Sequence, residues 1–304
     1  MINVGERGVL LMGYGSPRSM DEIEVYFTSI RRGSGPSQTE LEELKRRYDA
    51  IGGISPLNSI TANQVVLLQK SLEVAGSDTR IYLGMKHSEP LIRDVARAIK
   101  SDGITELLCL PLAPFYSKIG TETYFDAVRE SEIANAVSVQ YVKSWNKEEG
   151  LVKCWSRSIW AAAMGFNASG FRLIFTAHSL PITAADNLDT YRNQLGETAK
   201  LAADTLGVGE WDLVFQSAGM RGRTWIGPSI YDHMAELQSK GQSSFLVAPI
   251  GFIADNLETL YDAGIRCREW AAKSGASVIT AAAPNDSKEL IAALHSVVRK
   301  NGFE

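Results

Sequence analysis

Short apolar runs alternate with longer amphipathic stretches along most of the chain. The runs that fit buried strands are residues 9–13, 80–85, 106–111, 137–142, 173–177, 212–216, 245–249 and 276–280. Strands separated by helical patterns are typical of β-α units around a parallel sheet. Eight strands of this kind indicate two four-stranded sheets.

An internal repeat supports that division. The segment SDGITELLCLPLAPFY aligns without a gap on SKGQSSFLVAPIGFIA, and ETYFDA then matches ETLYDA after a two-residue shift. The first strands of the two halves also end alike, in YGSP from Tyr14 and HSLP from His178. Because self-similarity in the same order indicates repeated structural units, we predict an α/β protein of two similar domains, residues 1–146 and 147–304.

Two similar halves that meet along their strand ends would form a cleft. Ligands bind beyond the carboxyl ends of parallel strands and at interfaces between domains. We therefore expect Tyr14, His87, His178 and the loop before Glu258 to face one another.

Composition and charge narrow the classes of partner. The 304 residues are 45% hydrophobic and 22% charged, as in globular proteins, and the formal net charge is −4. A chain without a global positive field is poorly suited to nucleic acid or to an anionic membrane. The longest early apolar run, residues 9–12, is far shorter than a signal-peptide core or a membrane span, and no basic leader precedes it, so we expect a cytoplasmic protein.

The cysteines carry no sign of a metal or disulfide framework. Cys109, Cys154 and Cys267 are odd in number, widely spaced and not part of a C-x-x-C pair. Other motifs are missing as well. GYGSPR lacks the third glycine of the dinucleotide fingerprint, and neither a G-x-x-x-x-G-K-[ST] loop nor a G-x-S-x-G elbow occurs. Phosphoryl and acyl transfer are therefore disfavoured.

His178 is the strongest catalytic candidate among the four histidines. It follows the apolar run 173–177 in FRLIFTAHSLP, and a strand end is where functional groups gather. His233 and His295 lie in helical patterns, where a partly buried imidazole is ordinary, and His87 is intermediate. From the pattern alone, packing remains an alternative role for His178.

Two interpretations of ADNLETLYDAG remain open. Asp255 could cap a helix, with Glu258 completing a capping box. Alternatively, Glu258 and Asp262, four residues apart and so on one helix face, could handle a divalent cation together with a neutral histidine. Arg31, Arg47 and the basic residues near them could likewise be a solvated helix face or a rim that binds carboxylates.

Taken together, the segments LLMGYGSP, IRRGSGP, KRRYDAIGGISPL, GMKHSEPLI, TETYFDAV, TAHSLP, FQSAG…WIGP and PIGFIADNLETLYD resemble the ferrochelatase family, in this order and from end to end. The resemblance implies two Rossmann-like domains of the class II chelatase type, each a four-stranded parallel sheet flanked by helices, with a porphyrin cleft between them. It also implies insertion of Fe2+ into a porphyrin without ATP, in haem biosynthesis.

The resemblance assigns roles to individual residues. His178 and Glu258 would face the ring from one side as catalytic and metal-binding residues, with Tyr14 and Asp262 as further candidate metal ligands. The positions that bind propionates in this family correspond to Arg31, Arg47, Tyr48, Ser55 and Tyr124, and Tyr14 would also contact the substrate.

The chain is most similar to the short members that metallate coproporphyrin III, so this porphyrin is the preferred substrate and protoporphyrin IX the alternative. A sirohydrochlorin chelatase and a porphyrin carrier without catalysis are weaker alternatives. Arg266 stands where close relatives continue the acidic face, which puts an outer metal site in doubt. The cysteine-rich tail of iron-sulfur members is absent, so no intrinsic cofactor is expected. We expect a monomer, with transient contact to other haem-synthesis enzymes as an open alternative.

Overall fold

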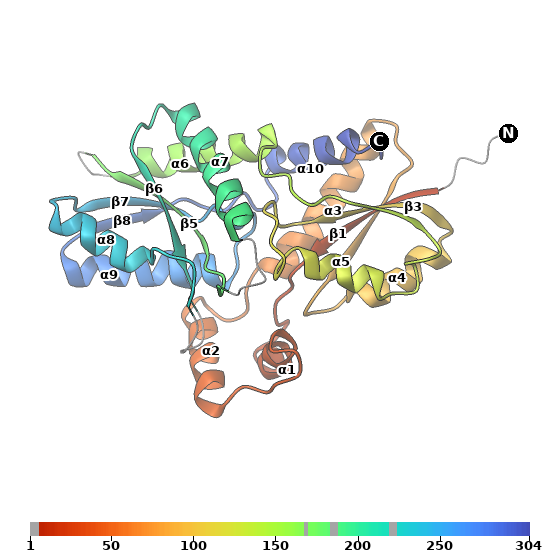
Figure 1. The fold of residues 1–304 in the computed structure, drawn as a ribbon, viewed down its shortest axis with the longest axis horizontal. Coiled ribbons are helices and arrows are strands. Elements are labelled where there is room, and N and C mark those ends of the chain that lie inside the picture. Colours follow the sequence, from red (N-terminus) through yellow and green to blue (C-terminus); the bar gives the residue numbers. More distant parts are fainter. Residues whose placement is uncertain (1–5, 167–169, 183–187, 219–223) are drawn as a thin grey trace. The chain divides into compact units, whose positions relative to one another are not determined.

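The computed structural model describes residues 6–166, 170–182, 188–218 and 224–304, which form two parallel four-stranded sheets with helices on both faces (Figure 1). This confirms the predicted fold class. Contacts divide the chain into unit 1, Met1–Trp145 with Asn285–Glu304, and unit 2, Asn146–Pro284. Of the family-like segments, Gly219 in FQSAG lies outside the described residues.

Unit 1 has the strand order β2-β1-β3-β4. Its elements are β1 (Glu6–Gly13), η1 (Met20–Glu22), α1 (Ile23–Ile30), α2 (Gln38–Ala50), α3 (Leu57–Val74), β2 (Arg80–Met85), α4 (Ile92–Ser101), β3 (Ile104–Pro111), α5 (Glu122–Arg129), β4 (Ser138–Tyr141) and α10 (Lys288–Lys300). Leu10 and Met12 of β1 pack with buried side chains of α4 and α5. Because successive side chains of a strand point to opposite faces, Val9 and Leu11, which are also buried, face the other side of the sheet.

Unit 2 has the equivalent order β6-β5-β7-β8, so the repeat in the sequence is a repeat of topology. Its elements are α6 (Glu149–Met164), β5 (Arg172–His178), α7 (Leu188–Leu206), β6 (Trp211–Gln216), α8 (Ile230–Ser239), β7 (Ser244–Ala248), η2 (Glu258–Arg266), α9 (Cys267–Ser274) and β8 (Ser277–Thr280). Ile174 and Val247 of the sheet pack with Met234 of α8 and Ala263 of η2 in one core cluster. The segment η2 is a π-helix, which the sequence pattern did not predict.

The last helix departs from the predicted domain limits. We placed residues 147–304 in one domain, whereas the structure assigns Asn285–Glu304 to unit 1, where α10 packs on α3 (Figure 1). Gln64 on α3 donates to the Asn285 carbonyl oxygen over 2.6 Å, and the Thr79 hydroxyl donates to that of Phe303 over 2.7 Å. An amphipathic pattern predicts that a helix buries one face, but it does not name the sheet that covers that face.

No helix within the described ranges has the length and apolar content needed to cross a membrane.

Candidate functional site

The carboxyl end of β5 presents His178 at the edge of a fully buried strand. Leu173, Ile174 and Phe175 have no exposed surface, whereas His178 is partly exposed. Its Nδ1 lies 2.5 Å from the Ser179 carbonyl oxygen. Because a carbonyl oxygen only accepts, Nδ1 must carry the hydrogen of the neutral ring, which leaves the lone pair on Nε2. This tautomer suits His178 to accept a proton or to bind a metal.

The loop after β7 lies directly against this strand end. The Gly251 amide donates to the Thr176 carbonyl oxygen over 3.2 Å. A Cβ at position 251 would lie 2.6 Å from the Ala177 Cβ and 2.8 Å from its Cα, closer than real contacts allow. Only glycine lets the two segments approach so closely. The segment PIGF therefore brings the chain that leads to Glu258 next to the strand that ends in His178.

Glu258 is the first residue of the π-helix η2 and is partly exposed. The Asn256 Oδ1 accepts from the Glu258 and Thr259 amides over 2.8 and 3.1 Å, and the Thr259 hydroxyl accepts from the Asn256 amide over 2.9 Å. Of the two interpretations left open above, the capping box of Asp255 and Glu258 is therefore wrong, because the Asn256 side chain accepts from these amides. The Asp255 carboxylate accepts from the Thr259 hydroxyl over 3.3 Å. The Glu258 carboxylate is therefore not used as a cap.

Gln216 at the end of β6 connects the two candidates, and sequence reasoning missed it. It pairs with His178 in the register of β5 and β6. Its side-chain Nε2 donates to the Glu258 carbonyl oxygen over 3.3 Å, and its Oε1 accepts from the Thr176 hydroxyl over 3.4 Å. A buried glutamine at a strand end was the signal available in FQS. These bonds place His178 and Glu258 on one connected platform.

Asp262 and Arg266 follow Glu258 along the same helix. Asp262 is 2% exposed, its Oδ2 accepts from the Ser217 hydroxyl over 2.6 Å, and its Oδ1 lies 3.5 Å from the Arg266 guanidinium. The Arg266 guanidinium also stacks over the Tyr231 ring at 4.8 Å. No cluster of three or more His, Cys, Asp or Glu side chains arranged to hold a metal occurs in the parts of the chain that the structure describes.

Tyr14 occupies the corresponding strand end in unit 1, directly after β1, and is 40% exposed. Its carbonyl oxygen accepts from the His87 amide over 3.0 Å, and the two rings meet edge-on with centroids 4.7 Å apart. The His87 Nδ1 lies 2.9 Å from the Ser29 hydroxyl on α1. Burial, and to a smaller degree the charge of Lys86, lowers the pKa of His87 from 6.5 to about 4. The neutral His87 ring therefore packs against the Tyr14 ring.

Lys86 is a second polar group at this end that sequence reasoning passed over. Its ammonium donates to the Thr123 hydroxyl over 2.6 Å and lies 5.7 Å from the ring centroid of Tyr124 and 6.0 Å from that of Tyr14. Burial, followed by the charge of Arg32, lowers the pKa of Lys86, and burial raises the pKa of the Tyr124 phenol. Two phenols and a cation thus share this strand end.

The predicted propionate-binding residues are arranged unequally. Arg31 forms an ion pair of 2.7 Å with Glu40, which also accepts in the capping box of α2. The Ser37 amide, the Arg31 guanidinium and the Ser37 hydroxyl lower the pKa of Glu40 to about 2. Arg47 is partly exposed. The structure buries Tyr48, Ser55 and Tyr124, with exposures of 2%, 5% and 5%.

The remaining histidines have local structural partners. The His233 Nε2 lies 3.2 Å from Asp212, and the His295 ring contacts the Ser71 hydroxyl at 2.6 Å and Glu304 at 2.8 Å. These contacts agree with the ordinary role that the helical patterns suggested for both.

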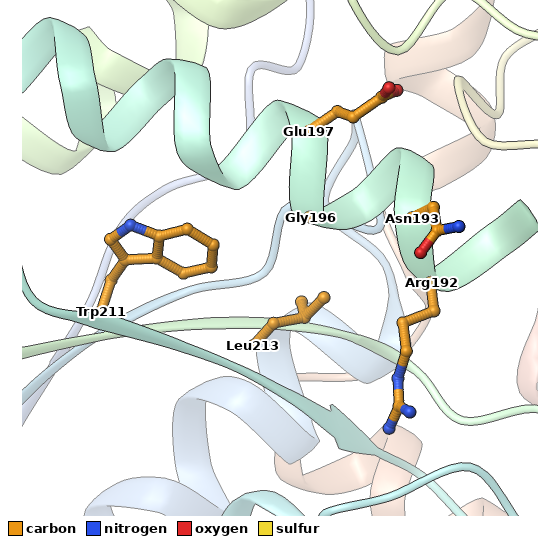
Figure 2. A pocket seen from close by; sticks show the side chains of 6 residues that line it. All are labelled: Arg192, Asn193, Gly196, Glu197, Trp211 and Leu213. Atoms are coloured by element: carbon orange, nitrogen blue, oxygen red, sulfur yellow. The ribbon is translucent and has the colours of Figure 1, made fainter. Parts of the chain in front are cut away.

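An open pocket of about 570 Å³ lies between α7 and β6 (Figure 2). It is lined by Arg192, Asn193, Gly196, Glu197, Trp211 and Leu213. Arg192 donates to the Gly227 carbonyl oxygen, and Glu197 accepts from Asn146 and Lys147 over 2.9 and 2.8 Å. Both charged groups are thus engaged within the chain, and we do not assign this pocket to the site.

Comparisons with known proteins identify the relatives of this chain. Residues 6–302 match the family described as Ferrochelatase. A coproporphyrin III ferrochelatase from Geobacillus sp. (strain WCH70) is 38% identical, with 96% of this chain and 97% of that protein covered. A coproporphyrin III ferrochelatase from Bacillus subtilis (strain 168) is 39% identical with the same coverage.

Solved structures show the same fold at low identity. SirB from Bacillus subtilis with Fe3+ has a TM-score of 0.60 at 13% identity, covering 98% of this chain and 99% of that chain. CbiX, described as the terminal enzyme of sirohaem biosynthesis in denitrifying bacteria, has a TM-score of 0.52 at 14% identity, covering 97% and 99%. At these identities the likeness concerns the fold alone.

Proposed function

This chain belongs to the ferrochelatase family, whose members insert a metal ion into a porphyrin, and we propose that its reaction is the ATP-independent insertion of Fe2+ into coproporphyrin III in haem biosynthesis. The relatives of nearly equal length carry that name. The reaction consumes one Fe2+ and the free porphyrin and releases two pyrrole protons.

The observation that carries the proposal is the platform at the end of β5 and β6. His178 presents Nε2 as a lone-pair donor, because its Nδ1 donates to the Ser179 carbonyl oxygen. Gln216 pairs with His178 and holds the Glu258 carbonyl oxygen. A proton acceptor and a carboxylate are thus carried by neighbouring elements that hydrogen bonds connect, as the preorganised chemistry of a catalytic site requires.

His178 and Glu258 have different roles in the proposed metal insertion. Pyrrole nitrogens bind Fe2+ only after their N–H protons leave, so neutral His178 either accepts a proton or holds the incoming metal. The Glu258 carboxylate lowers the free-energy cost of bringing a dication into an apolar site, and it passes protons outward. In this proposal Tyr14 is a further candidate ligand of the metal.

We prefer coproporphyrin III as the substrate because of the number of its propionate groups. Coproporphyrin carries four propionates, and forked arginine donors bind carboxylates strongly. We assign this role to Arg31 and Arg47, with the hydroxyl groups of Tyr48, Ser55 and Tyr124. Arg31 keeps further guanidinium donors beyond the one that meets Glu40, since only its NH1 is used in that bond.

No resident cofactor is part of the proposal. The three cysteines are each free and buried, in separate elements, which is a poor basis for an iron-sulfur cluster. We further propose that the enzyme works as a monomer in the cytoplasm, with at most transient contact to other haem-synthesis enzymes, and light scattering on the purified protein checks its mass.

The test is anaerobic metallation with Fe2+ and, in separate assays, coproporphyrin III, protoporphyrin IX or sirohydrochlorin, followed by absorbance. We expect the larger kcat/KM with coproporphyrin III. Turnover confined to protoporphyrin IX would contradict the substrate assignment, turnover of sirohydrochlorin alone would favour the other chelatases of this fold, and binding of the ring without metallation would indicate a carrier.

A further inference from the structure

We propose that Ser217 and Asp262 form a positioning pair that fixes Glu258 relative to His178, an inference that rests on the function proposed above. The pair joins the end of β6 to the middle of the π-helix η2. Neither residue needs to touch iron or porphyrin for this role.

The Asp262 carboxylate is buried and has defined contacts on both oxygens. Oδ2 accepts from the Ser217 hydroxyl over 2.6 Å, and Oδ1 lies 3.5 Å from the Arg266 guanidinium. The side chain of Asp262 is 3% exposed, whereas that of Arg266 is 47% exposed. Hydrogen bonds to a buried carboxylate are among the strong ones in proteins. The Asp262 carboxylate therefore holds Ser217, the residue that directly follows β6.

Side chains from other elements hold the carbonyl groups of η2 from outside. Gln216 donates to the Glu258 carbonyl oxygen over 3.3 Å and Tyr231 to that of Asp262 over 2.9 Å. At the end of β8, the Thr280 hydroxyl donates to the Ala263 carbonyl oxygen over 2.7 Å. Nine residues of π-helix are unusual, since this geometry is mostly confined to single turns. Such a helix depends on its tertiary bonds for its shape.

The dipeptide Gln216–Ser217 connects the π-helix η2 to the strand that lies beside His178. Gln216 lies opposite His178 in the sheet. Ser217 adopts a left-handed backbone with φ of 59°, a conformation that non-glycine residues adopt only when their surroundings enforce it. The two side chains bond to η2 at points four residues apart, Glu258 and Asp262. These two bonds therefore fix the position of Glu258 relative to β5, the strand that carries His178.

Positioning and direct participation differ in what they require of position 262. A metal ligand or proton carrier needs the negative charge of Asp262. A positioning residue needs only an oxygen that accepts from Ser217, which Asp262→Asn retains at equal size. Arg266 would turn toward water in this variant, because nearly half of its side chain is already exposed.

The experiment compares Ser217→Ala, Asp262→Ala and Asp262→Asn with the parent protein. Ser239→Ala is the matched control, since the Ser239 hydroxyl only donates to the Glu236 carbonyl oxygen at the end of α8. We measure kcat and KM for Fe2+ with coproporphyrin III, the Kd of coproporphyrin III by fluorescence quenching, and amide hydrogen exchange of η2.

We expect Ser217→Ala and Asp262→Ala to lower kcat by roughly 10- to 100-fold, since a displacement of about 1 Å can cost 100-fold. The Kd of coproporphyrin III should stay within about twofold, because the pair does not contact the ring, and η2 amides should exchange faster. Asp262→Asn should stay within about threefold of the parent in kcat and match its exchange.

Two results would overturn the inference. The first is parent-like kcat and exchange in Ser217→Ala. The second is Asp262→Asn as slow as Asp262→Ala with parent-like exchange, which would show that the charge itself takes part. A parent protein that does not metallate any porphyrin would count against the proposed function alone, since the exchange of η2 still tests the pair.

Discussion

Gly251→Ala should damage the site through backbone displacement, without removing a functional group. The added Cβ would lie 2.6 Å from the Ala177 Cβ and 2.8 Å from its Cα, whereas ordinary contacts begin at 3.4 Å. The loop and the end of β5 must therefore separate by about 0.8 Å, the difference between 3.4 and 2.6 Å. One of the atoms is backbone, so rotation of a side chain cannot relieve the clash.

The size of the effect follows from this displacement. Adding a methyl group to a well-packed site costs about 1–3 kcal/mol of unfolding free energy. A misplacement approaching 1 Å between catalytic groups can lower the rate by about 100-fold. We expect kcat for Fe2+ insertion to fall by about 10- to 100-fold in Gly251→Ala, while the Kd of coproporphyrin III changes little.

Anaerobic metallation and urea unfolding measure the two effects on the same preparation. Gly196→Ala is the control, because Gly196 lies within α7 and a Cβ there would meet nothing within 4 Å. That variant should gain about 0.5–1 kcal/mol of stability, as alanine does over glycine in a helix, and keep the parent rate. Parent-like activity and stability in Gly251→Ala would refute the close-approach argument.

Three other perturbations test separate parts of the structure. Burial holds His87 neutral, with its pKa near 4 and not 6.5. The folded state therefore binds fewer protons than the unfolded chain, so the free energy of unfolding should fall by about 2 kcal/mol as pH drops from 6.5 toward 4. Urea titrations of His87→Phe should lack this contribution, and a variant with the same pH slope as the parent would argue against it. Asn256→Ala removes the acceptor for the Glu258 and Thr259 amides and should cost about 1–2 kcal/mol in chemical denaturation; no loss would mean that another group satisfies these donors. Arg31→Ala should raise KM for coproporphyrin III about tenfold, the value of one bond to a charged group, and leave KM for Fe2+ unchanged; equal KM values for the porphyrin would remove Arg31 from the propionate assignment.

The sheets and the position of His178 could be predicted because the pattern that encodes them is local. The apolar run that includes Val9 to Met12 is buried on both faces, which makes a central parallel strand easy to recognise. The same holds for the run before His178. Since β-strand ends of parallel sheets gather ligands, placing the strand also placed the candidate residue.

The features that escaped prediction depend on distant partners. The spacing of Glu258, Asp262 and Arg266 fits an α-helix as well as a π-helix. The bonds from Tyr231 and Thr280 to carbonyl groups of this helix come from distant elements, which a local pattern does not show. Likewise, the sequence indicated Asp255 as a cap, whereas in the structure the Asn256 side chain accepts from the Glu258 and Thr259 amides.

The sequence pattern also did not show which elements the helices pack against. The pattern of α10 predicts a helix with one buried face, yet its packing on α3 in unit 1 joins segments more than two hundred residues apart, as the bond between His295 and Ser71 illustrates. Similarly, nothing local in FQS indicates that Gln216 bonds to Glu258 and Ser217 to Asp262.

The most direct test of the account is the anaerobic rate of Fe2+ insertion into coproporphyrin III by the parent protein and by His178→Ala, followed by absorbance with matched binding of the ring. The account predicts rapid insertion by the parent and a loss of at least about 100-fold in the variant, as expected when a general base is removed. Insertion by His178→Ala at the parent rate would contradict the central role of the histidine at the end of β5.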